Sequence, residues 1–197
     1  AYDKTERIAW GIDKAKNEDL FLKEKRIYEL SQIENGMPKV QPYQIGFRLL
    51  TTLLQTYSGD IDAVIASLKD VKEEQKETLR RRCVCAWYWI KESAPDCAPD
   101  FCFTLREDGS KAEDISGEML TAVRRVRDEV VPRLDTFAVD KDCQQAMYDI
   151  ATELGLESKA LFTALYHALI GKDQGPRLAS FFRIIGKEKL QKILSVY

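Results

Sequence analysis

Residues 158–170 have the sequence SKALFTALYHALI and are followed by Gly171; no other stretch indicates the fold as clearly. In a helix built from these residues, apolar side chains occupy almost every side, as in a helix at the centre of a bundle. Glycine readily adopts the left-handed conformation that ends many helices, so Gly171 is well placed to terminate this one. We therefore expect residues 158–170 to form a central, buried helix.

Apolar residues at helical spacing continue on both sides of this stretch. The expected helices cover residues 42–57, 61–68, 71–92, 116–134, 140–154 and 188–194. A further helix should begin at Pro176, since the fixed φ of proline suits a first turn. The side chains expected to cap helix N-termini are Asp60, Ser116 and Asp140. Residues 18–33 suit a strand and a helix equally well.

The pattern predicts an all-α protein, a helical bundle or helix cage in the form of two sub-bundles. The Pro-containing segment Ser93-Ala94-Pro95-Asp96-Cys97-Ala98-Pro99 breaks the helical pattern and is typical of a linker. The short apolar run 101–105 could be extended. We therefore expect a helical domain over residues 1–92, a linker over 93–115 and a C-terminal helical domain over 116–197.

Composition and charge limit the function classes. The chain has 197 residues, of which 45% are hydrophobic and 31% charged, and this excludes a disordered or low-complexity protein. No apolar run reaches the roughly 18–20 residues of a membrane span, so no membrane partner is expected. The net charge of −2 argues against a generally cationic nucleic-acid binder. Residues 158–197, however, carry a net charge of +5, so this part could still meet a polyanion.

The cysteines and the single histidine, His167, form no recognisable catalytic or metal-binding pattern. Five cysteines without a signal-peptide core indicate a reducing, cytoplasmic compartment. Cys83 and Cys85 would point about 200° apart on a helix, unlike the paired cysteines of zinc sites. We expect reduced, mostly buried thiols, no metal site, no catalytic residues and no phosphate-binding glycine loop.

Several short motifs follow one another toward the C-terminus. They are ELGL (153–156), LFTALY (161–166), LIGK (169–172), GPRL (175–178) and IGKEK (185–189). With KRIYELS (25–31) and Trp89-Ile90 leading into Ala94-Pro95, the series resembles the C-terminal anticodon-binding region of the class I lysyl-tRNA synthetases. This resemblance covers essentially the whole chain. Its most specific part is the series Gly-Lys, Gly-Pro-Arg-Leu and Ile-Gly-Lys.

The resemblance implies a helix cage over residues 116–197 that grips the uridine-rich anticodon of lysine tRNA, with residues 1–92 as a helical connector domain. Catalysis in this family uses a His-Ile-Gly-His-type motif and a Lys-Met-Ser-Lys-Ser-type loop, and neither string occurs here. ATP and Mg²⁺ would accordingly bind a catalytic Rossmann domain of the parent ligase. The chain also lacks an initiator Met, so we expect it to be a fragment of that enzyme. We expect this fragment to be catalytically inactive, because the motifs are absent, and to be monomeric.

Two other functions remain open. The glutamyl-tRNA synthetases share part of the C-terminal pattern, although Gly175-Pro176-Arg177-Leu178 and Ala164-Leu165-Tyr166 favour the lysyl family. A helical adaptor that binds another protein would suit the near-neutral charge and the acidic segment 93–157, whose net charge is −8. A small enzyme is disfavoured because no reactive constellation is present.

The loop 171–177 is the strongest candidate for RNA contact. Lys172 and Arg177 can meet phosphates, Gly175 permits close approach of the backbone, and a helix start adds amide donors. Arg183 lies off the apolar stripe of its helix and should also be exposed, within reach of a phosphate or a base. The alternative is a loop that only turns the chain, with Arg177 paired to an acidic helix.

Three more residues are weaker candidates. His167 could read a base edge, although we expect it to be mostly buried with Tyr166. Arg82 and Trp89 are seven residues apart and would share a helix face on which a base could stack. The simpler interpretation is a packed Trp89 beside solvated arginines. Phe181 and Phe182 likewise suit the core better than a stacking surface.

Overall fold

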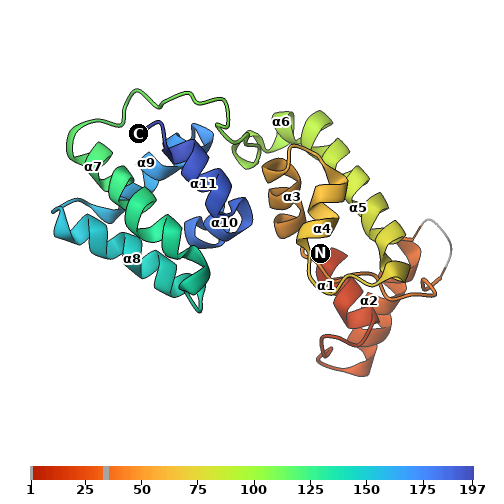
Figure 1. Cartoon of the computed structure of the whole chain (residues 1–197). Coiled ribbons are helices and arrows are strands. Elements are labelled where there is room, and N and C mark those ends of the chain that lie inside the picture. Colours follow the sequence, from red (N-terminus) through yellow and green to blue (C-terminus); the bar gives the residue numbers. More distant parts are fainter. Residues whose placement is uncertain (1, 33–35) are drawn as a thin grey trace. The chain divides into compact units, whose positions relative to one another are not determined.

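The structure is a computed structural model that describes residues 2–32 and 36–197. These residues form eleven α-helices and no β-strand, which confirms the all-α prediction (Figure 1). The chain divides into two compact units, which we call the first unit (up to Ser93) and the second unit (Ala94–Tyr197). No helix within the described ranges is long and apolar enough to cross a membrane.

The described residues of the first unit form five helices. They are α1 (Tyr2–Ala9), α2 (Glu18–Leu30), α3 (Phe47–Thr56), α4 (Ile61–Ser67) and α5 (Glu73–Glu92). Helix α1 packs on α2, and α3 and α4 pack on α5. The ambiguous stretch 18–33 is helical as far as Leu30; residue 33 lies outside the described residues. The Asp60 carboxylate accepts a hydrogen bond from the Ala63 amide at 3.0 Å, which confirms it as the cap of α4.

The start of α3 corrects one expectation. The helix begins at Phe47 and not at Pro42, and residues 41–46 are irregular. The Phe47 amide donates to the carboxylate of Asp3, on α1, at 2.8 Å. A tertiary contact therefore caps the helix five residues after the proline that suits a first turn, and sequence periodicity alone cannot show such a contact.

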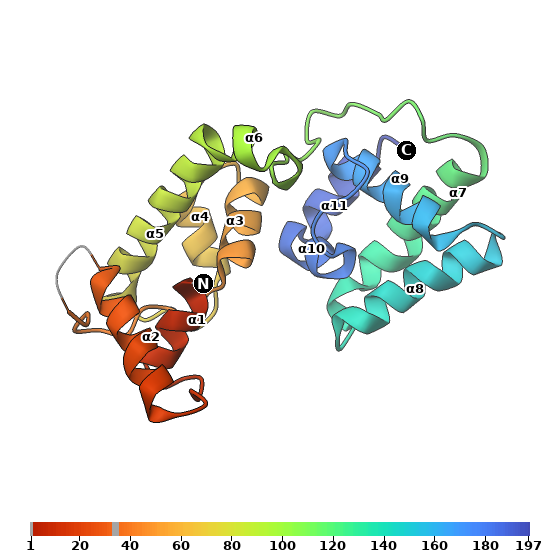
Figure 2. The same ribbon diagram turned by 180° about the vertical axis from the view of Figure 1, so that it is seen from behind.

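The second unit contains a bundle around α9. Its helices are α6 (Ala94–Cys97), α7 (Gly117–Arg125), α8 (Asp140–Glu153), α9 (Ser158–Ile170), α10 (Leu178–Ile185) and α11 (Lys187–Leu194). Helix α9 contacts α7, α8 and α11, as both views show (Figures 1 and 2). Leu161, Leu165 and Leu169 on α9 are completely buried, and Phe181 and Phe182 of α10 belong to the same core. The prediction of a helix over 158–170 ended by Gly171, whose φ is +66°, is confirmed.

Four predicted details of the second unit are wrong. Ser116 stands at the N-cap position of α7, but its side chain makes no capping hydrogen bond. The helix expected over 116–134 ends at Arg125 and continues as a π turn (Val126–Val130) and a 3-10 turn (Val131–Thr136), because Pro132 cannot donate an α-helical hydrogen bond. Asp140 does not cap α8, since its carboxylate binds Ser180 and Arg183 of α10. Helix α10 begins at Leu178, two residues after the predicted proline.

The segment that we assigned to a linker contributes to the second unit. Leu105, Ala112 and Ile115 lie in its buried core. The Arg106 amide donates to the Leu169 carbonyl at 2.9 Å, and the Ala112 amide donates to the Tyr197 hydroxyl at 2.7 Å. Residues 102–106 run as irregular chain without a strand, and Phe101 ends a short 3-10 turn (Pro99–Phe101).

The thiols are less buried than predicted. Cys83 and Cys143 are buried, whereas Cys85 and Cys97 are exposed and Cys102 is intermediate. Burial raises the pKa of the Cys143 thiol to about 11. Cys85 is exposed because it lies two residues after Cys83, on the opposite side of α5. Among the described residues, no group of three or more His, Cys, Asp or Glu side chains is arranged to hold a metal ion.

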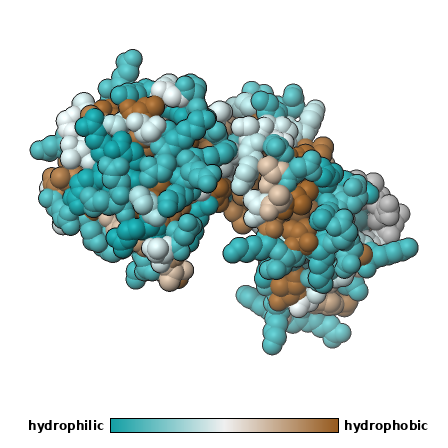
Figure 3. Space-filling model, viewed as in Figure 1, coloured by the Kyte–Doolittle hydropathy of each residue, from teal (hydrophilic) through white to brown (hydrophobic). Residues whose placement is uncertain are grey.

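The surfaces of the two units differ. On the face shown in Figure 3, hydrophobic residues gather over the first unit, while the surface of the second unit is mostly hydrophilic. Leu22, Ile27 and Leu30 of α2 are examples of exposed apolar side chains in the first unit.

Candidate nucleic-acid interface

The loop 171–177 joins α9 to α10 and is fixed against α9. The Tyr166 hydroxyl donates a hydrogen bond to the Pro176 carbonyl at 2.7 Å. Gly175 lies so close to α9 that an added Cβ would be 2.9 Å from Ile170 Cδ1 and 3.1 Å from the Tyr166 ring. A side chain at this position would have to displace packed atoms. The absence of a side chain therefore serves the packing of the loop on its own helix.

His167 is a second anchor of this loop. Its Nε2 atom lies 2.7 Å from a carboxylate oxygen of Asp173, in the loop, and its Nδ1 atom contacts Asp114, in the segment before α7. Partial burial lowers the pKa of His167, but the two carboxylates outweigh this effect, so the pKa is raised from its usual value. The side chain of His167 is 23% exposed, so it is mostly buried as predicted, but it faces polar neighbours outside the core. Both of its nitrogens are engaged, so they cannot read a base edge without releasing a carboxylate.

Arg177 carries the accessible charge of the loop. It is exposed, and the structure gives its guanidinium no hydrogen bond or ion pair with any described residue. It directly precedes α10, whose first residue is Leu178. Lys172 is half-buried in the same loop, and Gly175 lies between the two cations. Three predicted site residues, Lys172, Gly175 and Arg177, thus lie on one anchored loop. No described acidic side chain neutralises Arg177, in contrast to the alternative interpretation.

Arg183 is exposed, as expected, but it is engaged within the protein. Its Nε atom lies 2.7 Å from an Asp140 carboxylate oxygen, and its Nη2 atom donates to the Phe137 carbonyl at 2.7 Å. These contacts join α10 to the start of α8. Any phosphate contact by Arg183 has to compete with the Asp140 carboxylate.

The structure does not join Arg82 and Trp89 into one stacking face. Arg82 makes ion pairs with Asp3 at 2.6 Å and with Glu6 at 3.3 Å, and its side chain is 18% exposed. Trp89 instead packs edge-on against Phe47, with the ring centroids 5.3 Å apart. The expected shared face is thus a packed tryptophan beside an arginine that acidic side chains neutralise.

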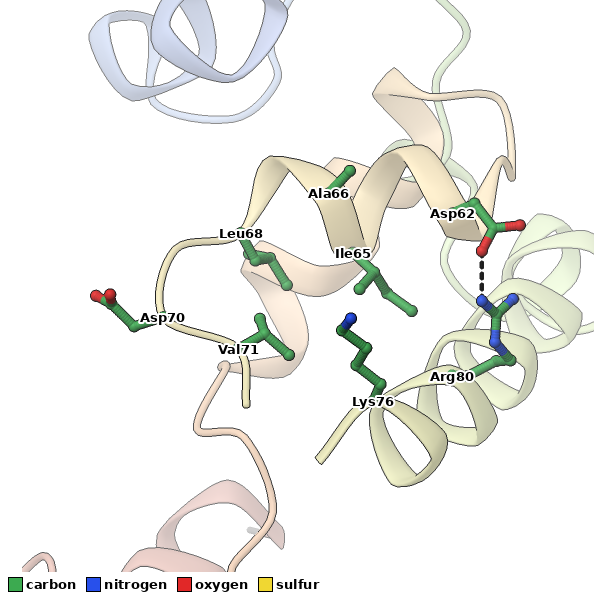
Figure 4. A pocket seen from close by; sticks show the side chains of 8 residues that line it. All are labelled: Asp62, Ile65, Ala66, Leu68, Asp70, Val71, Lys76 and Arg80. Carbon is green, nitrogen blue, oxygen red and sulfur yellow. Dashed lines mark hydrogen bonds and ion pairs between the residues drawn. The ribbon is translucent and has the colours of Figure 1, made fainter. Parts of the chain in front are cut away.

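The neighbouring arginines of α5 are also paired. Arg80 forms an ion pair with Asp62 of α4, as the dashed line in Figure 4 shows. This pair lies at the edge of a hollow of about 430 Å³ that Lys76 and Asp70 also line. The hollow therefore combines both signs of charge, and it offers a phosphate no uniformly basic surface.

Sequence reasoning missed a group of aromatic residues on α8 and α9. Lys159, Phe162, Thr163 and Tyr166 lie on one face of α9, and with Tyr148 of α8 they line a hollow of about 610 Å³. The spacing of the four α9 residues is i, i+3, i+4 and i+7, and this pattern in the sequence indicates that they share one face of the helix. Because most residues of α9 are apolar, we interpreted the helix as buried on all sides, but this face is only partly covered.

Comparison with known proteins defines the class first. Residues 100–195 match the family described as the anticodon binding domain, so the second unit is an anticodon-binding domain. This match places the anchored loop, Lys172, Gly175 and Arg177 inside a domain of that class.

The relatives identify the particular family. The chain is 50% identical over its full length to a lysine–tRNA ligase of Treponema pallidum, and 36% identical over 196 residues to that of Borreliella burgdorferi. It is 34% identical to the enzyme of Thermococcus kodakarensis over 98% of the chain. The chain spans 36% of the length of each of these relatives. These matches confirm that it is homologous to the C-terminal anticodon-binding region of the class I lysyl-tRNA synthetases.

Proposed function

We propose that the second unit binds the anticodon loop of a lysine-accepting tRNA, as the RNA-recognising part of a lysine–tRNA ligase. The observation that carries this proposal is an anchored, exposed loop with the unpaired Arg177 guanidinium, inside an anticodon-binding domain. Single-stranded RNA is recognised by hydrogen bonds to base edges and by stacking on planar groups, with Lys and Arg on the phosphates. The loop provides a guanidinium, an ammonium and the start of α10 within seven positions.

The residues of the loop and of the two helices that it joins have separate roles in this proposal. Arg177 stacks on a base or donates to a uracil carbonyl, and Lys172 meets a backbone phosphate. Gly175, Tyr166 and His167 hold the loop in place, so less conformational freedom is lost on binding. Arg183 positions α10 through Asp140.

The activity of the parent enzyme is also part of the proposal. Lysine activation would need ATP and Mg²⁺, and the family motifs for this chemistry do not occur in the sequence. We accordingly propose no cofactor and no lysine-dependent exchange of pyrophosphate with ATP for this chain alone. Monomeric behaviour and a cytoplasmic location belong to the same proposal.

Filter binding of the chain to lysine and glutamate tRNA transcripts, at several salt concentrations, tests the function. Replacing Lys172 and Arg177 together by Ala should weaken binding and reduce the slope of log affinity against log salt by roughly one to two units. The matched control replaces Lys23 and Arg26 of α2, which removes the same kinds of charge from the first unit. Equal slopes for the wild type and the Lys172/Arg177 variant would exclude the loop as the phosphate contact.

The same titration distinguishes lysine-tRNA binding from the two alternative functions, glutamate-tRNA binding and protein binding. A preference for glutamate tRNA would indicate the glutamyl family, and the absence of salt-dependent binding to either tRNA would favour a protein-binding adaptor. The identity to lysine–tRNA ligases over the full chain favours the lysyl reading.

A further inference from the structure

The partly covered face of α9 forms a hollow with α8 and the 171–177 loop. We call it the aromatic pocket; its lining residues are Tyr148, Lys159, Phe162, Thr163, Tyr166, Asp173 and Gln174. All of them belong to the second unit. The pocket has a volume of about 610 Å³, within the range of roughly 300–1,000 Å³ that is common for small-ligand sites.

Neighbouring contacts restrain all three rings of the pocket. Tyr148 and Phe162 pack against each other with a centroid distance of 5.0 Å and an angle of 42° between the ring planes. The Tyr148 hydroxyl accepts a hydrogen bond from Gln144 Nε2 at 3.1 Å. The Tyr166 hydroxyl is bound to the Pro176 carbonyl, and its ring lies against Gly175. All three rings are only half-buried, so each keeps some surface for a ligand.

The polar groups of the pocket are available. Within the described residues, the structure gives no hydrogen-bond partner to the side chains of Thr163, Gln174 and Lys159. Together they offer a hydroxyl, an amide that both donates and accepts, and an ammonium. Asp173 also lines the pocket, and one of its carboxylate oxygens lies 2.7 Å from His167 Nε2. This set suits a flat, neutral ring with hydrogen-bonding edges that is attached to an anion.

We infer that the aromatic pocket holds one unstacked nucleobase of the bound RNA. The base packs on the Phe162 and Tyr166 side of the pocket, Gln174 and Thr163 bind its edge, and Lys159 meets the adjoining phosphate. This inference rests on the proposed function, and it adds a second contact surface beside Arg177. It also gives a reason for aromatic side chains on an incompletely covered helix face.

An abasic scan tests the inference with the full chain. The probe is the anticodon stem-loop of lysine tRNA, in which each loop nucleotide in turn is replaced by an abasic unit. For the wild type, one abasic position should weaken binding about tenfold, since stacking on an aromatic side chain accounts for losses of this size. In the Phe162→Leu variant, the intact hairpin should bind about tenfold more weakly, and the same abasic position should cause no further loss.

Two additional variants test whether the weaker binding of Phe162→Leu comes from a general loss of stability. Gln174 lies on the exposed loop, so Gln174→Ala changes the edge-binding group without removing core packing, and it should reduce the preference among bases at that position. Tyr88→Leu is the matched control, because Tyr88 of α5 is a 67% exposed aromatic residue of the first unit. It should bind all hairpins as the wild type does.

The outcomes separate this inference from the function on which it rests. If the wild type binds the hairpin but Phe162→Leu and Gln174→Ala show the wild-type affinity and abasic profile, the pocket is overturned and the proposed function stands. If the wild type binds neither the hairpin nor the full tRNA, the proposed function fails, and the inference fails with it.

Discussion

The two units of this chain differ in how strictly they separate polar from apolar side chains. Among the described residues, the buried polar or charged side chains all lie in the first unit: Thr5, Glu6, Thr51, Thr52, Gln55 and Thr56. Of the large hydrophobic side chains that are exposed in the described part of the chain, only Val139 lies in the second unit. The second unit thus has the apolar interior of an ordinary globular domain, whereas the first unit buries several polar groups beside its apolar core and leaves more large apolar side chains exposed.

This contrast indicates different sources of stability. The buried threonines of α3 are satisfied by carbonyls one turn earlier, as Thr52 Oγ1 donates to the Arg48 carbonyl at 2.8 Å. Glu6 is 2% exposed and depends on the Arg82 guanidinium. We therefore expect the first unit to be sensitive to charge and the second to the loss of apolar volume. The three tryptophans, Trp10, Trp87 and Trp89, all lie in the first unit, so their fluorescence reports on that unit.

The largest effect is expected from Leu165→Ala in the second unit. Leu165 is completely buried on α9, and the cavity left by such a truncation costs about 2–5 kcal/mol of the free energy of unfolding. Urea unfolding followed by far-UV circular dichroism should show this loss, while tryptophan fluorescence stays close to the wild type. Leu22→Ala is the control, since Leu22 is 55% exposed on α2 and its truncation should cost no more than about 0.5 kcal/mol. A small loss for Leu165→Ala would remove the contrast between the units.

An effect of about 3 kcal/mol is expected from Arg82→Met in the first unit, because removing one partner leaves Glu6 as an unpaired buried carboxylate. Urea unfolding followed by tryptophan fluorescence should detect it. Arg81→Met is the control, as Arg81 is exposed and its ion pair with Glu77, at 3.5 Å, joins two exposed side chains of the same helix. If both variants were equally stable, the buried pair would not support this unit.

The pH dependence of Arg82→Met sharpens this test. Burial is the main cause that raises the pKa of Glu6 above its usual value, and the Arg82 charge opposes it. A carboxyl with a raised folded-state pKa takes up its proton more readily in the folded than in the unfolded state. The variant should therefore regain stability relative to the wild type as the pH falls toward the folded-state pKa of Glu6. A loss that stays constant with pH would point to lost packing on Arg82 in place of an unpaired charge.

The smallest effect concerns His167 in the second unit. Its raised pKa means that its ion pairs contribute fully below the unfolded-state pKa of about 6.5, and that this contribution is lost as the pH rises through the folded-state pKa. Asp114 and Asp173 are mostly exposed, so the loss should stay below about 1 kcal/mol. Because His167 is the only histidine, an NMR titration of its ring measures the folded-state pKa directly. A value at or below about 6.5 would contradict the two-carboxylate anchor.

The parts that were predictable from sequence are those that local patterns determine. The helix 158–170, its end at Gly171 and the cap at Asp60 depend on neighbouring residues, and the structure confirms them. The start of α3 depends on Asp3, more than forty residues earlier, and the partners of Asp140 lie on another helix. No local pattern contains such tertiary contacts.

The candidate site divides in the same way. The residues of the 171–177 loop follow from motif and charge, so Lys172, Gly175 and Arg177 could be named from the sequence. The aromatic pocket could not, because Tyr148 joins it from α8, and because Phe162 and Tyr166 have the apolar character of a core helix. Only the packing of neighbouring helices decides which face of α9 stays open.

We propose that this chain recognises the anticodon bases of lysine tRNA with the help of Arg177. The binding of lysine tRNA transcripts with an altered anticodon is the most direct test. The measurement is the Kd of the wild-type chain and of Arg177→Ala, at fixed salt, for the unmodified transcript and for one with its central anticodon uridine replaced. We expect the replacement to weaken wild-type binding about tenfold or more, since a lost base contact costs about 1–3 kcal/mol, and we expect Arg177→Ala to narrow this difference in affinity. Equal affinity of the wild type for both transcripts would contradict this proposal.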